Sequence, residues 1–273
     1  MIRCSGVSNG VGVVKGRLLA YSEATPPRQS YATLTCVSHG EPLPRGESLM
    51  ALVAPALLSA DFARLGEALG IIKAAGASMV HVDVMDGHFT PDLTVGQPVI
   101  RSLRRATDLA LDVRLAIERP ERYVGEFIEA GADRIAIHPE STARLGLVLQ
   151  LIRARRAKAG VALNTATRVE SVTEVLEDVD FVTILSAHSG VDDPFVPRSA
   201  GKISSCSQIR ANRRLDFAIQ VEGGVGFDNI EELIQAGADI LVTGSAIFDS
   251  GNPKDRLTQM IRLASEMRQT SRV

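Results

Sequence analysis

Short apolar runs alternate with amphipathic segments along the chain from Leu52 onward. A short apolar run bounded by polar residues predicts a buried strand, whereas apolar residues three and four positions apart predict a helix packed against it. Helical spacing is clear at Phe62, Leu65, Leu69 and Ile72. The predicted strands cover residues 52–58, 79–85, 109–117, 134–138, 160–163, 181–186, 216–221 and 240–243.

Eight strands that alternate with helices predict an α/β fold with a parallel sheet, and eight such units favour a closed (β/α)8 TIM barrel over an open sheet. Three helical segments end in Ala-Gly-Ala, with the glycines Gly76, Gly131 and Gly237. Each glycine is suited to a left-handed helix C-cap. No G-x-G-x-x-G follows the first strand, which argues against a dinucleotide-binding fold.

The beginning of the chain differs from the rest. Residues 1–49 are rich in Gly, Ser, Thr and Pro and show no sustained helical or strand period. We therefore predict a flexible or disordered extension over residues 1–49 and one barrel domain over residues 50–273. The extension is either without a role in the chemistry or a regulatory arm.

Composition indicates that the protein's ligand is a small molecule. The formal net charge is −2, and no basic cluster interleaves with aromatic residues, so neither nucleic acid nor an anionic membrane surface is an expected partner. No apolar run approaches the roughly 20 residues that span a bilayer. Cys4, Cys36 and Cys206 are widely spaced, which suggests neither a disulfide framework nor a zinc site. The expected location is the cytoplasm.

Polar residues inside predicted barrel strands are the main functional signal, because catalytic residues collect at the carboxyl ends of such strands. The second strand places His81 and Asp83 on one face, the third Arg114, and the seventh Glu222. A buried structural ion pair between Arg114 and Asp83 or Glu222 is one interpretation. A His, two acidic groups and an Arg at strand ends favour a catalytic site.

Two glycine-rich turns follow the last two strands. Gly223 and Gly224 come after the seventh strand, and Gly244 and Ser245 after the eighth. Tight turns alone would explain them, but barrels often bind phosphate through backbone N–H groups at this place. The sequence therefore predicts a phosphorylated ligand.

The same residues carry a resemblance to the ribulose-phosphate 3-epimerase family, which covers nearly everything after Met50. Its most specific motif is HVDVMDGHF at residues 81–89. The other motifs follow in the family's order: APALLSADF at 54–62, LDV at 111–113, ERP at 118–120, IH at 137–138, LNTAT at 163–167, GGV at 223–225 and GSAIF at 244–248.

The resemblance implies a homo-oligomeric isomerase that inverts C3 of a ketose phosphate, interconverting ribulose 5-phosphate and xylulose 5-phosphate. It implies a divalent zinc, iron or manganese ion held by His, Asp, His and Asp, with the two Asp residues as acid and base. It also implies substrate contacts at Ser59, His81, His138 and the four residues of the glycine-rich turns. Two of the metal ligands are His81 and Asp83; the other two fall on Arg114 and Glu222.

These two departures change the expected chemistry. Arginine has no free lone pair and stays protonated, so Arg114 cannot bind a metal and repels one. We expect His81, Asp83 and Glu222 to hold metal weakly or not at all, and Arg114 to pair with Asp83 or Glu222.

The expected function is C3 epimerisation with Asp83 and Glu222 as acid and base and Arg114 as the fixed cation. Further departures leave two alternatives open: an isomerase or epimerase for another sugar in a specialised pathway, and a catalytically silent ligand-binding barrel. Ala116 and Leu185 replace two family methionines, and Asp192 and Asp193 stand in a loop that binds phosphate in the family.

Overall fold

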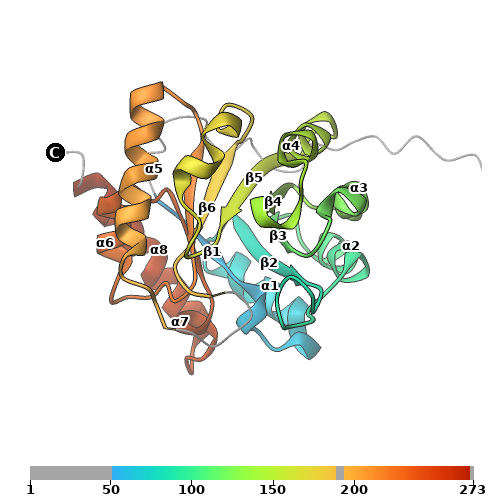
Figure 1. Ribbon diagram of the computed structural model, residues 1–273. Coiled ribbons are helices and arrows are strands. Elements are labelled where there is room, and N and C mark those ends of the chain that lie inside the picture. Colours follow the sequence, from blue (N-terminus) through green and yellow to red (C-terminus); the bar gives the residue numbers. More distant parts are fainter. Residues whose placement is uncertain (1–50, 189–193, 271–273) are drawn as a thin grey trace, which may run out of the picture. The chain divides into compact units, whose positions relative to one another are not determined.

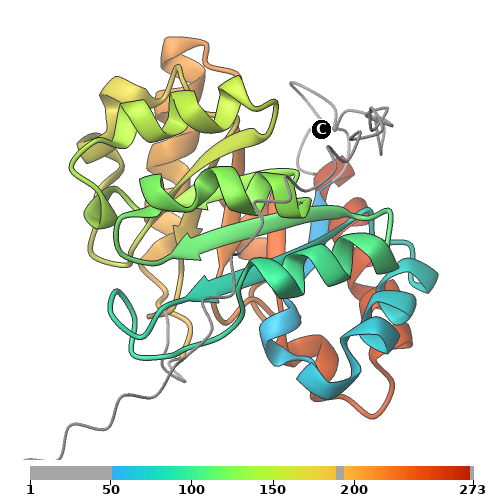
Figure 2. The same cartoon turned by 90° about the vertical axis from the view of Figure 1, so that its right-hand side faces the viewer.

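The computed structural model describes residues 51–188 and 194–270, which form a (β/α)8 barrel with parallel strands inside and helices outside (Figures 1 and 2). Neighbouring strands follow the order β1-β8-β7-β6-β5-β4-β3-β2. A bridge between Ala56 and His81 links the ends of this sheet and closes the ring. The strands are β1 (Leu52–Pro55), β2 (Met79–Met85), β3 (Ala110–Ala116), β4 (Arg134–Ile137), β5 (Lys158–Leu163), β6 (Phe181–Leu185), β7 (Ala218–Glu222) and β8 (Ile240–Thr243).

Helices or short 3-10 turns separate successive strands, as the apolar spacing predicted. The α-helices are α1 (Leu65–Ala74), α2 (Gln97–Ala106), α3 (Val124–Ala130), α4 (Leu145–Ala154), α5 (Ser199–Arg213), α6 (Ile230–Ala236), α7 (Ser245–Phe248) and α8 (Pro253–Thr270). The 3-10 helices are η1 (Leu57–Ser59), η2 (Phe62–Arg64), η3 (Pro120–Arg122), η4 (Pro139–Ser141) and η5 (Val169–Val175).

The predicted glycine caps are confirmed. Gly76, Gly131 and Gly237 have φ angles of 91°, 115° and 113°, in the left-handed region that glycine adopts without strain. Gly131 is also needed for close packing, because an added Cβ would lie 2.5 Å from Cγ of Arg104. These caps turn the chain from each helix directly into the next strand.

The first strand is shorter than predicted. Residues 52–58 form one apolar run, but β1 ends at Pro55 and Leu57–Ser59 form η1. The N–H of Ala56 still donates to the carbonyl of Thr243, and the N–H of Ala60 then closes a turn on the carbonyl of Leu57. This turn places Ser59 beside the loop after β8.

The barrel interior is filled unevenly. Ala54, Ala136, Gly160 and Ala162 are small, and larger side chains occupy the space that they leave. At Gly160 an added Cβ would lie 2.3 Å from the ring of Phe181, so that position admits no side chain at all. The middle of the barrel is therefore free to hold the long polar side chains of the neighbouring strands.

Some predictions concern residues that the structure does not describe. The predicted extension over residues 1–49, with Cys4 and Cys36, and the two acidic residues of the loop at 189–193 lie outside the described residues. Cys206 is a free buried thiol, and burial raises its pKa to about 12. Among the described residues, no helix combines the length and the apolar character needed to cross a membrane.

Candidate active site

Four polar side chains from β2, β3 and β7 meet at the carboxyl end of the barrel. His81 and Asp83 come from β2, Arg114 from β3 and Glu222 from β7. Their exposed fractions run from 0% to 7%, so water hardly screens their charges. The strand register explains the meeting, because His81 pairs with Asp112, and Asp83 with Arg114, on the same face of the sheet.

The guanidinium of Arg114 lies between the two carboxylates. Its Nε and Nη2 donate to Oδ1 of Asp83 at 2.8 and 2.7 Å, and Nη2 also lies 2.8 Å from Oε1 of Glu222. The expectation that Arg114 pairs with Asp83 or Glu222 is confirmed, since it pairs with both. Burial lowers the pKa of Arg114, but the two carboxylates outweigh burial and raise it above its ordinary value.

His81 has a carboxylate at both ring nitrogens. Its Nδ1 lies 2.7 Å from Oδ2 of Asp112, and its Nε2 lies 3.2 Å from both Oδ1 of Asp83 and Oε2 of Glu222. Burial lowers the pKa of His81, but the charges of Asp83 and Glu222 and the bond to Asp112 hold it well above its ordinary value. The ring is therefore an imidazolium at neutral pH and donates from both nitrogens.

The two carboxylates that flank Arg114 differ in how strongly they are bound. Oδ1 of Asp83 accepts from both Arg114 and His81. Burial raises the pKa of Asp83, but Arg114 and His81 outweigh burial and hold that pKa far below its usual range. Oε1 of Glu222 contacts Arg114, but Oε2 of Glu222, 3.2 Å from Nε2 of His81, has no partner in hydrogen-bond geometry.

His138, which follows β4, accepts from Arg114. The distance from Nη1 of Arg114 to Nε2 of His138 is 3.2 Å, and because a guanidinium only donates, Nε2 carries no proton. Burial, followed by the charge of Arg114, lowers the pKa of His138 well below its ordinary value. The neutral ring therefore carries its proton on Nδ1, which is buried without a hydrogen-bond partner and lies 3.8 Å from Oε2 of Glu140.

A deeper layer of polar side chains was not predicted as part of the site. Arg134 of β4 donates from Nε to Oδ1 of Asp112 at 2.9 Å and from Nη2 to Oε1 of Gln220 at 3.1 Å. Nε2 of Gln220 in turn donates to Oδ2 of Asp112 at 2.9 Å. Asp112 and Gln220 stand two positions before Arg114 and Glu222 on the same strands and so share their inward faces, but Arg134 stands at the beginning of its strand and gave no functional signal.

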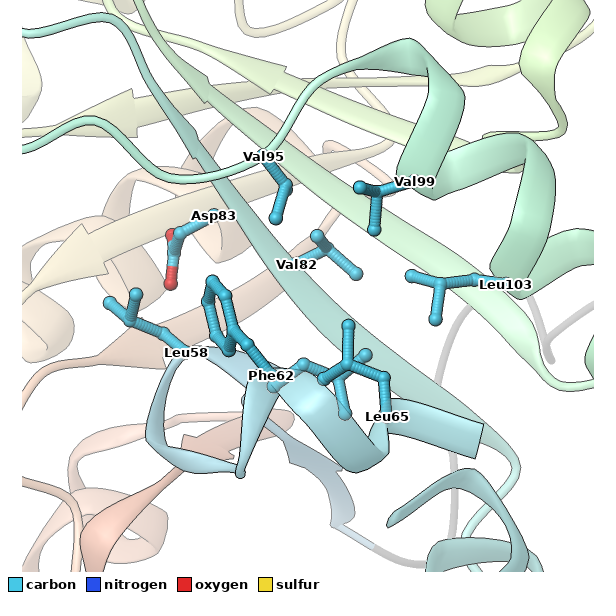
Figure 3. A pocket seen from close by; sticks show the side chains of 9 residues that line it. Leu58, Phe62, Leu65, Val82, Asp83, Val95, Val99 and Leu103 are labelled. Atoms are coloured by element: carbon cyan, nitrogen blue, oxygen red, sulfur yellow. The ribbon is translucent and has the colours of Figure 1, made fainter. Parts of the chain in front are cut away.

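A small cavity reaches Asp83 from the side of η1 and α1 (Figure 3). Asp83 is the only charged residue among its lining side chains, and it faces Leu58 and Phe62, which are 40% and 45% exposed. These apolar groups keep water away from one side of the carboxylate. The remaining lining residues are Leu57, Leu65, Val82, Val95, Val99 and Leu103.

The glycine-rich turns lie where the chain packs closely. Gly223 and Gly224 have φ angles of 106° and 63°, and an added Cβ at Gly223 would lie 2.6 Å from the backbone N of Ala187. An added Cβ at Gly244 would lie 2.3 Å from Oγ of Ser59. Two of the predicted substrate contacts, Ser59 and Gly244, are therefore neighbours, and Ser245 begins α7 directly after them.

His81, Asp83 and Glu222 form a candidate metal site by donor type, because one ligand atom from each lies within 4.8 Å of the others. The arrangement nevertheless does not fit a bound metal. Nη2 of Arg114 lies 2.7 Å from Oδ1 of Asp83 and 2.8 Å from Oε1 of Glu222, so a divalent ion among these donors would lie beside a fixed positive charge. The positive charge next to Asp83 and Glu222 is that of the Arg114 guanidinium.

Comparisons with known proteins identify the family. The ribulose-phosphate 3 epimerase family model matches residues 52–248. The chain is 38% identical over 213 residues to ribulose-phosphate 3-epimerase of Bacillus subtilis, covering 77% of this chain and 98% of the relative. It is 39% identical over 249 residues to the chloroplastic ribulose-5-phosphate-3-epimerase of Arabidopsis thaliana, covering 90% and 89%. Identity to the Escherichia coli K12 ribulose-phosphate 3-epimerase is 40% over 211 residues, covering 77% and 94%.

A solved structure agrees on the fold. Thiamine phosphate pyrophosphorylase from Pyrococcus furiosus superposes with a TM-score of 0.56 at 14% sequence identity, covering 80% of this chain and 97% of that one. At this identity the likeness concerns the barrel alone.

Proposed function

The chain belongs to the ribulose-phosphate 3-epimerase family of isomerases, and we propose that it epimerises a ketose phosphate at C3 with Arg114 in the place of the family's divalent metal. The observation that carries this proposal is the guanidinium of Arg114 between Asp83 and Glu222, at 2.7 and 2.8 Å. It supplies a fixed positive charge where the two expected acid–base groups meet. We place the substrate of the ribulose 5-phosphate type at this end of the barrel.

In this mechanism Glu222 removes the proton at C3, and Asp83 delivers to the opposite face a proton that it takes from Nε2 of His81, 3.2 Å away. The proton on Glu222 then restores His81, whose Nε2 also lies 3.2 Å from Oε2 of Glu222. Glu222 is assigned the role of base because its Oε2 has no partner in hydrogen-bond geometry, whereas Oε1 of Glu222 and Oδ1 of Asp83 both contact Arg114. The electrons left at C3 move onto the carbonyl oxygen and form an enediolate. A preorganised cation beside that oxygen lowers the barrier, because the charge that develops there needs no reorganisation of water.

The phosphate is proposed to bind at Ser59, Gly223, Gly224, Gly244 and Ser245. This assignment is supported by the packing of Gly244 against Ser59 and by the backbone conformation of the glycines after β7. The Nδ1 proton of His138 is a buried donor without a partner and is proposed to bind a substrate oxygen, directly or through water.

The hydrogen bonds that hold the Asp83 carboxylate favour one competing function, ligand binding without catalysis. A carboxylate whose pKa lies far below its usual range is a weak base, and a barrel that binds a sugar phosphate without turning it over would tolerate such a group. A different ketose phosphate as substrate is the other outcome to distinguish.

Solvent-deuterium incorporation at C3 tests these functions directly. The protein is incubated in D2O with several ketose phosphates, with and without a strong chelator, and C3 exchange is followed by NMR. We expect exchange that the chelator does not diminish, that is lost in Glu222→Gln, and that persists in Glu232→Gln, a change of an exposed carboxylate on α6. Exchange that disappears with chelator would refute the role of Arg114, and substrate binding without any exchange would favour the silent barrel.

A further inference from the structure

The polar layer beneath the active site consists of Asp112, Arg134 and Gln220, with Phe181 below Arg134. The three polar residues are 0–4% exposed, and three hydrogen bonds of 2.9–3.1 Å connect them in a closed triangle. The layer touches the active site at one point, the 2.7 Å contact from Oδ2 of Asp112 to Nδ1 of His81.

Arg134 is fixed from two sides. Its guanidinium donates hydrogen bonds to Asp112 and Gln220. The central guanidinium carbon lies 3.9 Å from the centroid of the Phe181 ring, within the range of a cation–π contact. The ring itself has no freedom to move away from the position that Gly160 leaves open, because it fills the space where a Cβ would stand. The orientation of the guanidinium is therefore determined by its surroundings.

Packing alone does not account for charges at this depth. A buried ion pair loses much of its attraction to desolvation, and well-packed apolar residues of similar volume are often as stabilising or more so. Neighbouring strands contribute small, uncharged side chains to the interior: Ala54, Ala136, Ala162 and Thr183. A layer that served only to fill the barrel would need no arginine.

The layer instead holds both oxygens of one carboxylate. Arg134 binds Oδ1 of Asp112, while Gln220 and His81 share Oδ2. With Asp112 unable to rotate, the imidazole ring of His81 is unable to rotate either, and its Nε2 stays aimed at Asp83 and Glu222. We propose that Arg134, together with Gln220, is a positioning residue that fixes the Asp112 carboxylate and through it the orientation of His81 between the two catalytic carboxylates. This inference rests on the proposed function for its kinetic test.

Arg134→Met and Arg134→Lys test the proposal, with Arg210→Met as the matched control. Arg210 of α5 also pairs with an aspartate, Asp239, and lies over a phenylalanine ring, Phe217, but outside the barrel interior. Each variant is measured for thermal unfolding, for kcat and KM with the best ketose phosphate, and for the NMR signal of the His81 Nδ1 proton. That signal is assigned by its loss in His81→Gln.

For Arg134→Met we expect kcat to fall about 100-fold with KM changed less than about threefold, as for a catalytic group displaced by about 1 Å. The His81 Nδ1 proton signal should shift or vanish. Arg134→Lys, which retains the charge, should recover part of both kcat and the signal. Arg210→Met should leave kcat and the His81 signal unchanged, even if its melting temperature falls as much as that of Arg134→Met.

Two results would overturn the proposal: an unchanged His81 signal in folded Arg134→Met, or equal kcat losses in Arg134→Met and Arg210→Met. If wild-type protein shows no epimerisation, the proposed function fails, but the His81 signal still decides whether Arg134 positions the ring. If Arg134→Met does not fold, kcat and the His81 signal of Arg134→Lys and Gln220→Leu are compared with those of Arg210→Met instead.

Discussion

Replacing Arg114 by His and Glu222 by Asp in one variant is expected to create a tight metal site. The change removes a buried cation and supplies a neutral imidazole beside His81 and Asp83. It also shortens the second carboxylate by one methylene. Neither reversion alone should be sufficient, since productive coordination tolerates errors of only about 0.2 Å in ligand distance.

The structure gives the size of the effect. Nη2 of Arg114 lies 2.7 Å from Oδ1 of Asp83, so a metal ion bound to that oxygen at about 2.1 Å would lie within about 5 Å of the guanidinium. At an effective dielectric constant of about 20, a dication at that distance from one positive charge is destabilised by about 7 kcal/mol. Such a penalty corresponds to roughly a 10⁵-fold loss of affinity.

Metal content after dialysis against a weak chelator, followed by competition titration with zinc, measures this difference. The double variant should hold one zinc ion per chain, and its dissociation constant should lie about 10⁵-fold below that of the wild type and of Glu222→Asp, which both keep Arg114. It should also lie below that of Arg114→His, in which Glu222 is still one methylene too long. Arg104→His is the matched control, because it places a new histidine beside a carboxylate, that of Asp133, outside the barrel interior. Stoichiometric zinc in dialysed wild-type protein, or equal affinity in Arg114→His and the double variant, would refute the reasoning.

Three further predictions follow from the same structure. Removing residues 1–48 should leave cooperative urea unfolding, followed by circular dichroism, with an unchanged midpoint; a lost transition would contradict the predicted domain boundary. Arg114→Met should lower the free energy of unfolding by about 3–5 kcal/mol, because it leaves two buried carboxylates without their partner, and a loss below about 1 kcal/mol in urea titrations would count against the buried pair. The pKa of Asp112 is about 2, lowered by Arg134 and His81 against the effect of burial, so its stabilisation is present above pH 4 and is lost as the pH falls towards 2. Asp112→Asn should remove about 2 kcal/mol of that acid-dependent stability, and an unchanged acid transition would show that the carboxylate is not bound in this way.

The fold was predictable because each strand and helix carries its own local signal. The period of the apolar residues located all eight strands, and the glycines at 76, 131 and 237 marked helix ends that the structure confirms. The exception is the run at 52–58, where hydrophobicity continued past Pro55 although the strand did not. Apolar character alone cannot distinguish a strand from a 3-10 turn.

The active site was predictable only in part. Alternation along β2, β3 and β7 gave the inward direction of Asp83, Arg114 and Glu222, and the structure brings these three together. Arg134 could not be predicted, because a charged residue at the start of a strand is ordinarily solvated. Its burial depends on how β4 lies between β3 and β5, and on the space that Gly160 provides, neither of which is local in sequence.

On the proposed function, the charges of the site balance without a metal. Asp83 and Glu222 are two buried negative charges, and in the family a dication balances such a pair. Here Arg114 and the imidazolium of His81 each contribute one positive charge, and the deeper pair of Asp112 and Arg134 is neutral by itself. If Arg114 stands in the place of the metal, as proposed, the net charge of the interior is preserved, with His81 protonated where a metal-binding histidine would be neutral. We therefore propose that Arg114 and Glu222 are one coordinated departure from the family pattern, because the buried cation and the buried carboxylate lie 2.8 Å apart and each offsets the charge of the other.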